Sequence, residues 1–279
     1  MTFTNRSAEI YIPENAKKAN KIYLAIAAHP DDIEIMAADG ILKSFYGSDN
    51  GFVAVVTADG GGSARDGRYK DFSDEDMMKI RRAEQKKAAV VGEYSTLYLL
   101  NYQSSVIKSP QNISIIEDYV KILKKHKPAV VYTHNLLDKH ETHLGVVVKA
   151  VQALRALPKS ERPPYFYGCE VWRNLDWLPD DEKVRFNLSS GENLQSALLG
   201  VFDSQISGGK RYDLATQGRR LSNATYSESH SVDVTRGMSY ALDLTPLIND
   251  PAVDIADFAL SKIDAFKKEA VEKLKKVLL

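Results

Sequence analysis

The sequence has little cysteine, no excess of either charge and no long apolar run, and each absence excludes a class of protein. Cys169 is the one cysteine in 279 residues, which excludes an internal disulfide and a multi-cysteine metal site. The 37 basic and 37 acidic side chains balance, whereas non-specific nucleic-acid binding needs a basic surface. No apolar run approaches the roughly 18–20 residues that span a bilayer, and residues 1–6 lack a secretory signal pattern. We therefore expect a cytoplasmic protein that binds neither nucleic acid nor membranes.

The length and composition are those of an ordinary globular domain. Hydrophobic residues make up 44% of the chain and charged residues 27%. A chain of this length buries roughly three-quarters of its unfolded surface, so it folds without disulfides. We predict a single domain over residues 1–279, with a core over about 20–175 and a C-terminal extension over about 176–279.

Strands and helices alternate along the first 170 residues. Continuous apolar runs at 22–28, 52–57, 97–100, 129–134 and 165–172 are typical of strands buried on both faces. Apolar residues at helical spacing follow them at 33–45, 74–91, 113–126 and 142–156. This alternation predicts an α/β fold of the Rossmann-like, doubly wound type with a mostly parallel sheet.

The pattern changes in the C-terminal extension. A helix is expected over 192–202, and the polar stretch 204–231 is expected to form surface loops with a short helix. Residues 254–279 carry apolar side chains at helical spacing, which predicts a long amphipathic helix packed through its apolar face. We expect a loop-rich extension that ends in this helix.

Two polar clusters follow predicted strands. His29-Pro30-Asp31-Asp32 follows the first strand, and the histidine-rich stretch 134–143 follows the fourth. Ligands of an open parallel sheet bind beyond the carboxyl ends of its strands, where these two strands can be neighbours. Two histidines and one aspartate leave coordination positions open, as catalytic zinc sites do. The acids of either cluster alone could simply cap a helix. Four of the six histidines lie in these two clusters, however, which favours a shared site.

Three motifs occur in order on this background. They are HPDDIE at 29–34 with a glycine-rich loop after it, Arg82-x-Glu84, and Asp138-x-His140-x-x-His143. Over residues 21–145 the sequence thereby resembles the PIG-L/LmbE family of zinc-dependent N-deacetylases, which act on N-acetylglucosamine-type substrates.

The resemblance implies a role for each of five residues. It implies that His29, Asp32 and His143 bind one Zn²⁺ per chain, and another divalent ion could occupy the same ligands. It implies that Asp31 is the general base for a metal-bound water. His140 would then stabilise the oxyanion or act as an acid.

Other residues near these motifs leave alternatives open. The resemblance implies that the glycine-rich loop rims a sugar pocket, with Arg65 as a donor to substrate hydroxyls or phosphate. The acid that often precedes the last histidine in the family is absent, so either Asp138 or Glu141 could orient a ligand histidine. Arg81, Arg82 and Glu84 are interpreted as a surface ion-pair row.

The sequence therefore predicts a metal-dependent hydrolase that removes an acetyl group from an N-acetylglucosamine-type sugar or glycoconjugate. One alternative is a non-catalytic α/β module that binds a sugar or a nucleotide. Another is a metal-dependent phosphoesterase, although two-metal enzymes of that class usually need more carboxylates than this site provides. The expected partner is a small N-acetylated molecule, and the prediction also allows a homo-oligomer.

Overall fold

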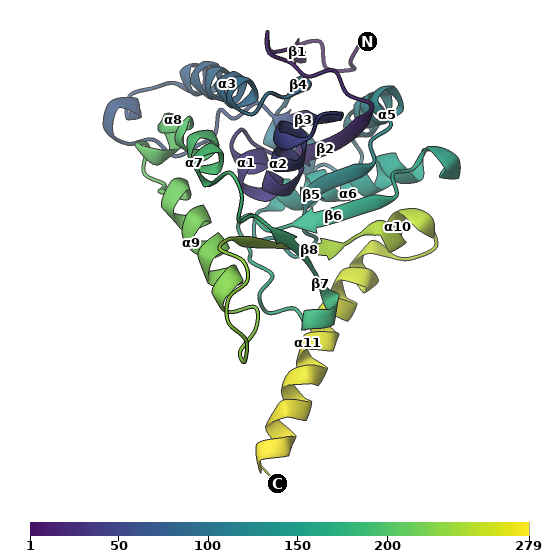
Figure 1. The fold of residues 1–279 in the computed structure, drawn as a ribbon. Coiled ribbons are helices and arrows are strands. Elements are labelled where there is room, and N and C mark those ends of the chain that lie inside the picture. The colour runs from purple at the N-terminus through teal and green to yellow at the C-terminus, as the bar shows by residue number, and fades with distance from the viewer. Residues whose placement is uncertain (279) are drawn as a thin grey trace.

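The computed structural model describes residues 1–278 and contains one eight-stranded sheet in the order β1-β4-β3-β2-β5-β6-β8-β7 (Figure 1). Its strands are β1 (Glu9–Tyr11), β2 (Lys21–Ala27), β3 (Asn50–Ala58), β4 (Thr96–Tyr102), β5 (Val130–His134), β6 (Tyr165–Cys169), β7 (Lys183–Asn187) and β8 (Met238–Asp243). Strands β2 to β6 run parallel, while β1, β7 and β8 pair antiparallel at the two edges. The mostly parallel, doubly wound sheet predicted from the sequence is confirmed.

Helices cover both faces of the sheet because successive side chains of each strand point to opposite faces. Leu24 and Ile26 of β2 pack into one core, and Tyr23 and Ala25 pack into the other. The first core is covered by α4 (Ser104–Lys108), α5 (Ser114–His126), α6 (Glu141–Arg155) and α10 (Thr245–Asn249). The second is covered by α1 (Asp32–Met36), α2 (Ala38–Tyr46), α3 (Asp74–Val91) and α7 (Glu192–Gly200).

The helix expected over 33–45 is divided into α1 and α2 by Ala37, whose backbone leaves the helical region at φ −111° and ψ 24°. The loops expected over 204–231 are partly wrong, because this stretch holds α8 (Asp203–Ile206) and the 14-residue α9 (Tyr212–Thr225). The buried positions of α9 are Thr216, Arg220, Asn223 and Ala224, so its inner face is mostly polar. Hydrophobic periodicity could not reveal such a helix.

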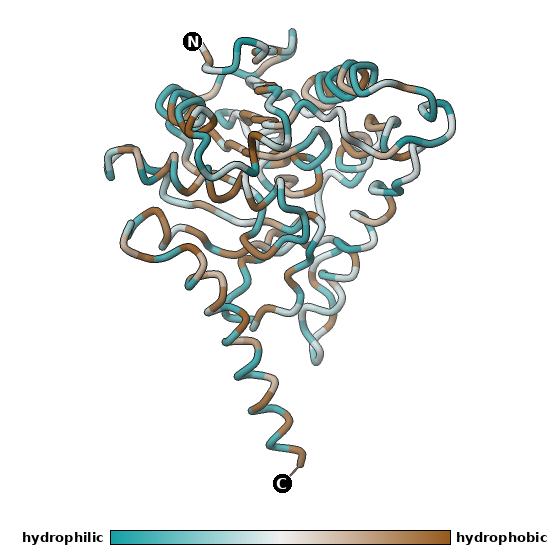
Figure 2. The backbone as a smooth tube through the Cα atoms, turned by 180° about the vertical axis from the view of Figure 1, so that it is seen from behind, coloured by the Kyte–Doolittle hydropathy of each residue, from teal (hydrophilic) through white to brown (hydrophobic). Residues whose placement is uncertain are grey.

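The long C-terminal helix forms as predicted, but it does not pack along the domain. Helix α11 (Ile255–Leu278) leaves the body and projects from it (Figures 1 and 2). Ala259 is its one buried residue among those described, and Phe266 touches the body through Trp177, with ring centroids 5.9 Å apart. Residue 279, the end of the predicted helix, lies outside the described residues. Within 1–278, no helix combines the length and apolar character required to cross a membrane.

Candidate metal centre

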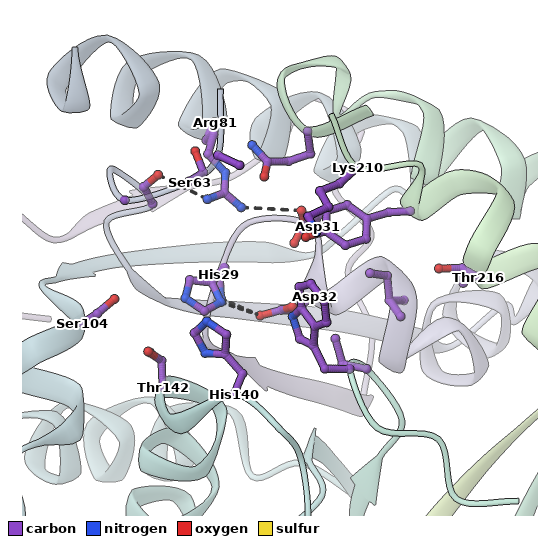
Figure 3. Close-up of a pocket in the computed structure, with 18 of the residues that line it drawn as sticks. His29, Asp31, Asp32, Ser63, Arg81, Ser104, His140, Thr142, Lys210 and Thr216 are labelled. Carbon is purple, nitrogen blue, oxygen red and sulfur yellow. Dashed lines mark hydrogen bonds and ion pairs between the residues drawn. The ribbon is translucent and has the colours of Figure 1, made fainter. Parts of the chain in front are cut away.

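The two polar clusters meet at the carboxyl ends of β2 and β5. These strands pair directly and in parallel, with Ala25 opposite Tyr132. The chain leaves β2 through His29 into α1, and it leaves β5 through a turn that leads to His140 and α6. Figure 3 shows His29, Asp32 and His140 side by side in the resulting cavity. The shared crevice predicted from strand order is therefore present.

The three predicted metal ligands present their donor atoms to one point. His29 Nδ1 lies 3.2 Å from His143 Nε2 and 3.3 Å from Asp32 Oδ2. The third side, from His143 Nε2 to Asp32 Oδ2, is 3.4 Å. Ligands about 2.0–2.1 Å from a tetrahedral zinc ion lie about 3.3 Å apart, so this triangle has the size of one face of such a site. The donor set and its spacing fit a divalent ion.

His134 lies behind this triangle. Its ring stacks on that of His143, with centroids 3.8 Å apart and planes inclined by 20°. Its Nε2 lies 3.6 Å from Asp32 Oδ2, but it already accepts a hydrogen bond from the Ala28 backbone N–H at 2.9 Å. With that lone pair engaged, His134 supports the ligand histidine rather than completing the ligand set.

Asp138, rather than Glu141, lies beside a ligand histidine. Its Oδ2 is 3.4 Å from His143 Nδ1, while its two oxygens accept hydrogen bonds from the backbone N–H groups of His140 and Trp172, each at 3.2 Å. Glu141 is 80% exposed and pairs with Lys108. A carboxylate beside the outer nitrogen of a metal-binding histidine fixes the ring and raises its basicity.

The charges around the triangle suit a cation. Burial alone would raise the pKa of Asp32, but the surrounding imidazoles, His143 foremost, hold that pKa below its usual range. Burial lowers the pKa of His29, so this ring is neutral at neutral pH, which is the form in which imidazole binds a metal. Burial opposes protonation of His143, yet Asp32 and Asp138 together raise its pKa. A metal ion would take the place of that proton.

Asp31 is held in a strained backbone conformation beside the ligands. Its φ of 94° is rare for a residue with a side chain, and its side chain makes no capping hydrogen bond to α1. The helix-cap interpretation is therefore wrong for this residue. Its backbone N–H donates to Gln85 Oε1 at 3.2 Å, and its Oδ2 lies 3.5 Å from Arg81 Nη2. Burial raises the pKa of Asp31 well above its usual range, and Arg81 opposes that rise.

His140 lies on the open side of the triangle. Its ring centroid is 4.9 Å from that of His29 and 4.7 Å from that of His143. Burial, followed by the two neighbouring imidazoles, lowers the pKa of His140 to about 4. The resting ring is therefore neutral near pH 7, so it can donate one N–H hydrogen bond and becomes an acid only after it gains a proton.

Arg81 and Glu84 are buried, so the surface ion-pair interpretation of these residues is wrong. Arg81 donates to the carbonyl oxygens of Pro30 at 2.7 Å and Gly60 at 3.2 Å, which ties the turn after β2 to the glycine-rich loop. Glu84 accepts hydrogen bonds from the N–H and the hydroxyl of Ser204 at 2.7 and 2.6 Å, which anchors α8 to α3.

Arg65, the predicted substrate donor, bonds within its own loop. Its guanidinium donates to the Gly61 carbonyl oxygen at 2.8 Å and pairs with Asp74. Arg65 is absent from the lining of the cavity, whereas its neighbours Ser63 and Ala64 belong to it.

The cavity above the triangle has a volume of about 610 Å³, within the range of small-molecule sites. Its floor holds His29, Asp31, Asp32 and His140. Its walls come from the glycine-rich loop, from Ser104 to Lys108, from Val171 and Trp172, and from α9. The part of the wall that comes from α9 and the residues just before it lies in the C-terminal extension, where the sequence allowed the fewest predictions.

Comparisons with known proteins agree with this geometry. The family profile described as "GlcNAc-PI de-N-acetylase", PIG-L, matches residues 24–154, which contain the triangle, Asp31 and His140. The uncharacterised deacetylase YaiS of Escherichia coli K12 is 30% identical over 142 residues, which are 49% of this chain and 69% of that protein. The chain belongs to the PIG-L family of deacetylases.

Solved structures share the fold at low sequence identity. An N,N'-diacetylchitobiose deacetylase from Pyrococcus horikoshii superposes with a TM-score of 0.64 at 16% identity, covering 85% of this chain and 88% of that one. GalB, a 4-carboxy-2-hydroxymuconate hydratase from Pseudomonas putida KT2440, gives 0.60 at 16% identity, with coverage of 80% and 96%. Because one fold carries both a deacetylase and a hydratase, the activity of this chain must be argued from its site.

Proposed function

We propose that the protein is a metal-dependent amidohydrolase that removes the acetyl group from an N-acetylated amino sugar or its conjugate. The observation that carries this proposal is the triangle formed by His29 Nδ1, Asp32 Oδ2 and His143 Nε2, with sides of 3.2–3.4 Å, beside the buried carboxylate of Asp31. Membership of the PIG-L family and the similarity to YaiS support the same activity.

His29, Asp32 and His143 would hold the ion, with zinc as the first candidate because neutral imidazole and carboxylate are its common ligands. When bound, the ion would lower the pKa of water and polarise the amide carbonyl. Three protein ligands leave room for both, and the open side of the triangle faces the cavity that His29 and Asp32 line.

Asp31 would take the proton of the attacking water. Asp31 is adjacent in the chain to the ligand Asp32, and its carboxylate faces Arg81 instead of capping α1. A general base must lie within hydrogen-bond reach of the proton it removes, and the contact between Gln85 and the Asp31 backbone N–H helps to hold this turn of the chain.

His140, which lines the same cavity, would act on the carbonyl oxygen of the reacting amide. A neutral imidazole can donate a hydrogen bond to the carbonyl oxygen as negative charge develops on it. Asp31 would then pass the proton that it took from the water to the leaving amine. Trp172 stacks on His140 at 6.5 Å between centroids, which limits the orientations of the imidazole.

The proposal is tested by metal analysis and acetate release. Purified protein should contain one divalent ion per chain, and acetate release from N-acetylglucosaminyl compounds should stop with a chelator and return when zinc is added. Asp31→Asn should keep the metal and lose at least about 100-fold in kcat, because a positioned base contributes about that much. An Asp31→Asn enzyme with wild-type turnover would refute the assignment of the base.

The same measurements separate the alternatives. A non-catalytic binding module would hold no stoichiometric metal and would release no acetate. A phosphoesterase would hydrolyse a phosphorylated substrate and leave the acetylated one intact. Acetate release that depends on the metal therefore excludes both.

A further inference from the structure

One face of α9 forms a wall of the cavity. Tyr212, Ala215, Thr216 and Arg219 line the cavity, and their spacing of i, i+3, i+4 and i+7 places them on one side of the helix. Lys210, two residues before the helix begins, lines the same cavity. Figure 3 shows Lys210 and Thr216 on one side of the triangle and Ser104 on the opposite side. We refer to Lys210, Tyr212, Thr216 and Arg219 as the α9 wall.

The polar groups of the α9 wall have few partners in the protein. Within residues 1–278, the Lys210 ammonium and the hydroxyls of Tyr212 and Thr216 form no hydrogen bond to another residue, and neither Lys210 nor Arg219 has a carboxylate within 4.0 Å. Arg219 uses one nitrogen, Nη1, to donate to the Val171 carbonyl oxygen at 2.5 Å. Polar groups that line a cavity and lack protein partners are available to a ligand.

The two cations converge on the same short segment. Lys210 Nζ lies 5.5 Å from the centre of the Trp172 ring, and Arg219 bonds to the adjacent residue, Val171. An ammonium over the face of an indole is held there by a cation–π interaction. Since Trp172 also stacks on His140, this segment joins the α9 wall to the reaction centre.

The other two cations of the cavity each face a carboxylate, and the Asp59 carboxylate, which also lines the cavity, accepts from the Gly61 backbone N–H. Arg81 faces Asp31 at 3.5 Å, and Lys108, on the opposite side, faces Glu141 at 3.5 Å. The triangle carries one carboxylate, and a divalent ion would more than neutralise it. Of the four cations that line the cavity, Lys210 and Arg219 are therefore the two without a carboxylate within 4.0 Å among residues 1–278, although the chain as a whole has a net charge of zero.

We propose that the α9 wall binds an anionic group, a carboxylate or a phosphate, on the part of the substrate attached to its N-acetylated sugar. The substrate class is then an anionic glycoconjugate. An arginine fork and a lysine ammonium each recognise either anion, and the two hydroxyls supply further donors. This inference rests on the proposed deacetylase function and adds the chemistry of the substrate beyond the acetyl group.

The test compares three N-acetylglucosaminides that share one linker and end in a neutral amide, a carboxylate or a phosphate. We expect kcat/KM for acetate release to be at least about tenfold higher for one or both anionic substrates, and the better of the two identifies the anion. Equal or higher efficiency with the neutral substrate would overturn the proposal while leaving the deacetylase function intact.

Variants locate the subsite. Arg219→Gln and Lys210→Met should each lower the ratio of anionic to neutral kcat/KM by about 10- to 100-fold, and Arg219→Lys should restore part of it. Lys79→Met, on the exposed face of α3, is the matched control and should keep the wild-type ratio. If Arg219 had a merely structural role, Arg219→Gln would lower kcat/KM equally for the anionic and the neutral substrates. If the ratio of anionic to neutral kcat/KM fell only in Lys108→Met, the anion would bind on the opposite wall. Either result refutes the proposal.

Calorimetry with metal-free protein gives a readout that does not depend on turnover. The anionic glucosaminides should bind at least about tenfold more tightly than the neutral one, and Arg219→Gln should remove the difference. If no substrate is deacetylated but this difference persists, the deacetylase function fails and the anion site remains. If no difference is seen, the anion site fails whatever the enzyme does.

Discussion

Asp138 offers a sharp test of how the site is supported, because one carboxylate serves three groups. It accepts from the backbone N–H groups of His140 and Trp172 at 3.2 Å, and it lies 3.4 Å from His143 Nδ1. In Asp138→Asn the amide keeps one oxygen acceptor and replaces the other with an NH₂ donor. Whichever way the amide turns, an N–H then faces another N–H in a buried position.

The magnitude follows from that mismatch. A buried donor without an acceptor costs about 1–3 kcal/mol, and loss of an outer carboxylate on a ligand histidine typically lowers metal affinity 10- to 100-fold, or about 1.4–2.8 kcal/mol. The first cost lowers the stability of the fold with or without metal, and the second lowers the metal affinity. We therefore expect Asp138→Asn to weaken Zn²⁺ binding by about 10- to 100-fold, measured by competition with a chromogenic chelator at fixed pH.

Glu141 supplies the matched control, since it is an acid in the same segment with an exposed side chain. Glu141→Gln should bind the metal within about twofold of wild type, because exposed ion pairs contribute little. Far-ultraviolet circular dichroism would establish that both variants are folded. The reasoning fails if Asp138→Asn binds metal as tightly as wild type, or if Glu141→Gln weakens binding as much as Asp138→Asn does.

Three further predictions follow from groups outside the triangle. Arg81→Met removes the hydrogen bonds to two carbonyl oxygens and the charge that faces Asp31. In steady-state assays kcat should therefore fall about 10- to 100-fold with KM little changed. A change confined to KM would contradict this prediction. Ser204→Ala leaves buried Glu84 with one bond fewer and should destabilise the fold by about 1–3 kcal/mol in urea unfolding; an unchanged midpoint would count against it. Burial lowers the pKa of His126 from 6.5 to about 4, so the unfolded chain binds the extra proton first and stability should fall by about 1–3 kcal/mol as pH drops from 6.5 to 4. His126→Gln should flatten that part of the pH profile, and an equal slope in both proteins would disprove the assignment.

Much of the fold could be predicted from local sequence. The continuous apolar run that forms β2 indicated a strand buried on both faces, and it lies at the centre of the sheet between β3 and β5. The antiparallel strands β7 and β8, on one side of the sheet, were missed because they lie in the C-terminal extension, where the regular alternation of strands and helices ends. For the stretch that holds α9, only a short helix among loops was predicted, because the inward positions Thr216, Arg220 and Asn223 are polar.

Some residues of the candidate site could likewise be predicted from the sequence, and others could not. The clusters around His29 and His143 could be placed at strand ends because strand order alone brings them together. Arg81 could not be assigned from spacing, because its partners are carbonyl oxygens at Pro30 and Gly60, which only the folded chain supplies. The sequence also could not show whether His134 is a ligand. That question depends on the hydrogen bond that the Ala28 backbone N–H donates to His134 Nε2, which only the folded chain reveals.

The most direct test of the account is a crystal structure of the metal-loaded protein with an anomalous difference map recorded at the absorption edge of the bound metal. We predict one peak per chain, about 2.0–2.1 Å from His29 Nδ1, Asp32 Oδ2 and His143 Nε2, with a further position open to the cavity. A peak coordinated by His134 in place of His29, or a fully metallated protein with no peak between these three side chains, would contradict the central claim.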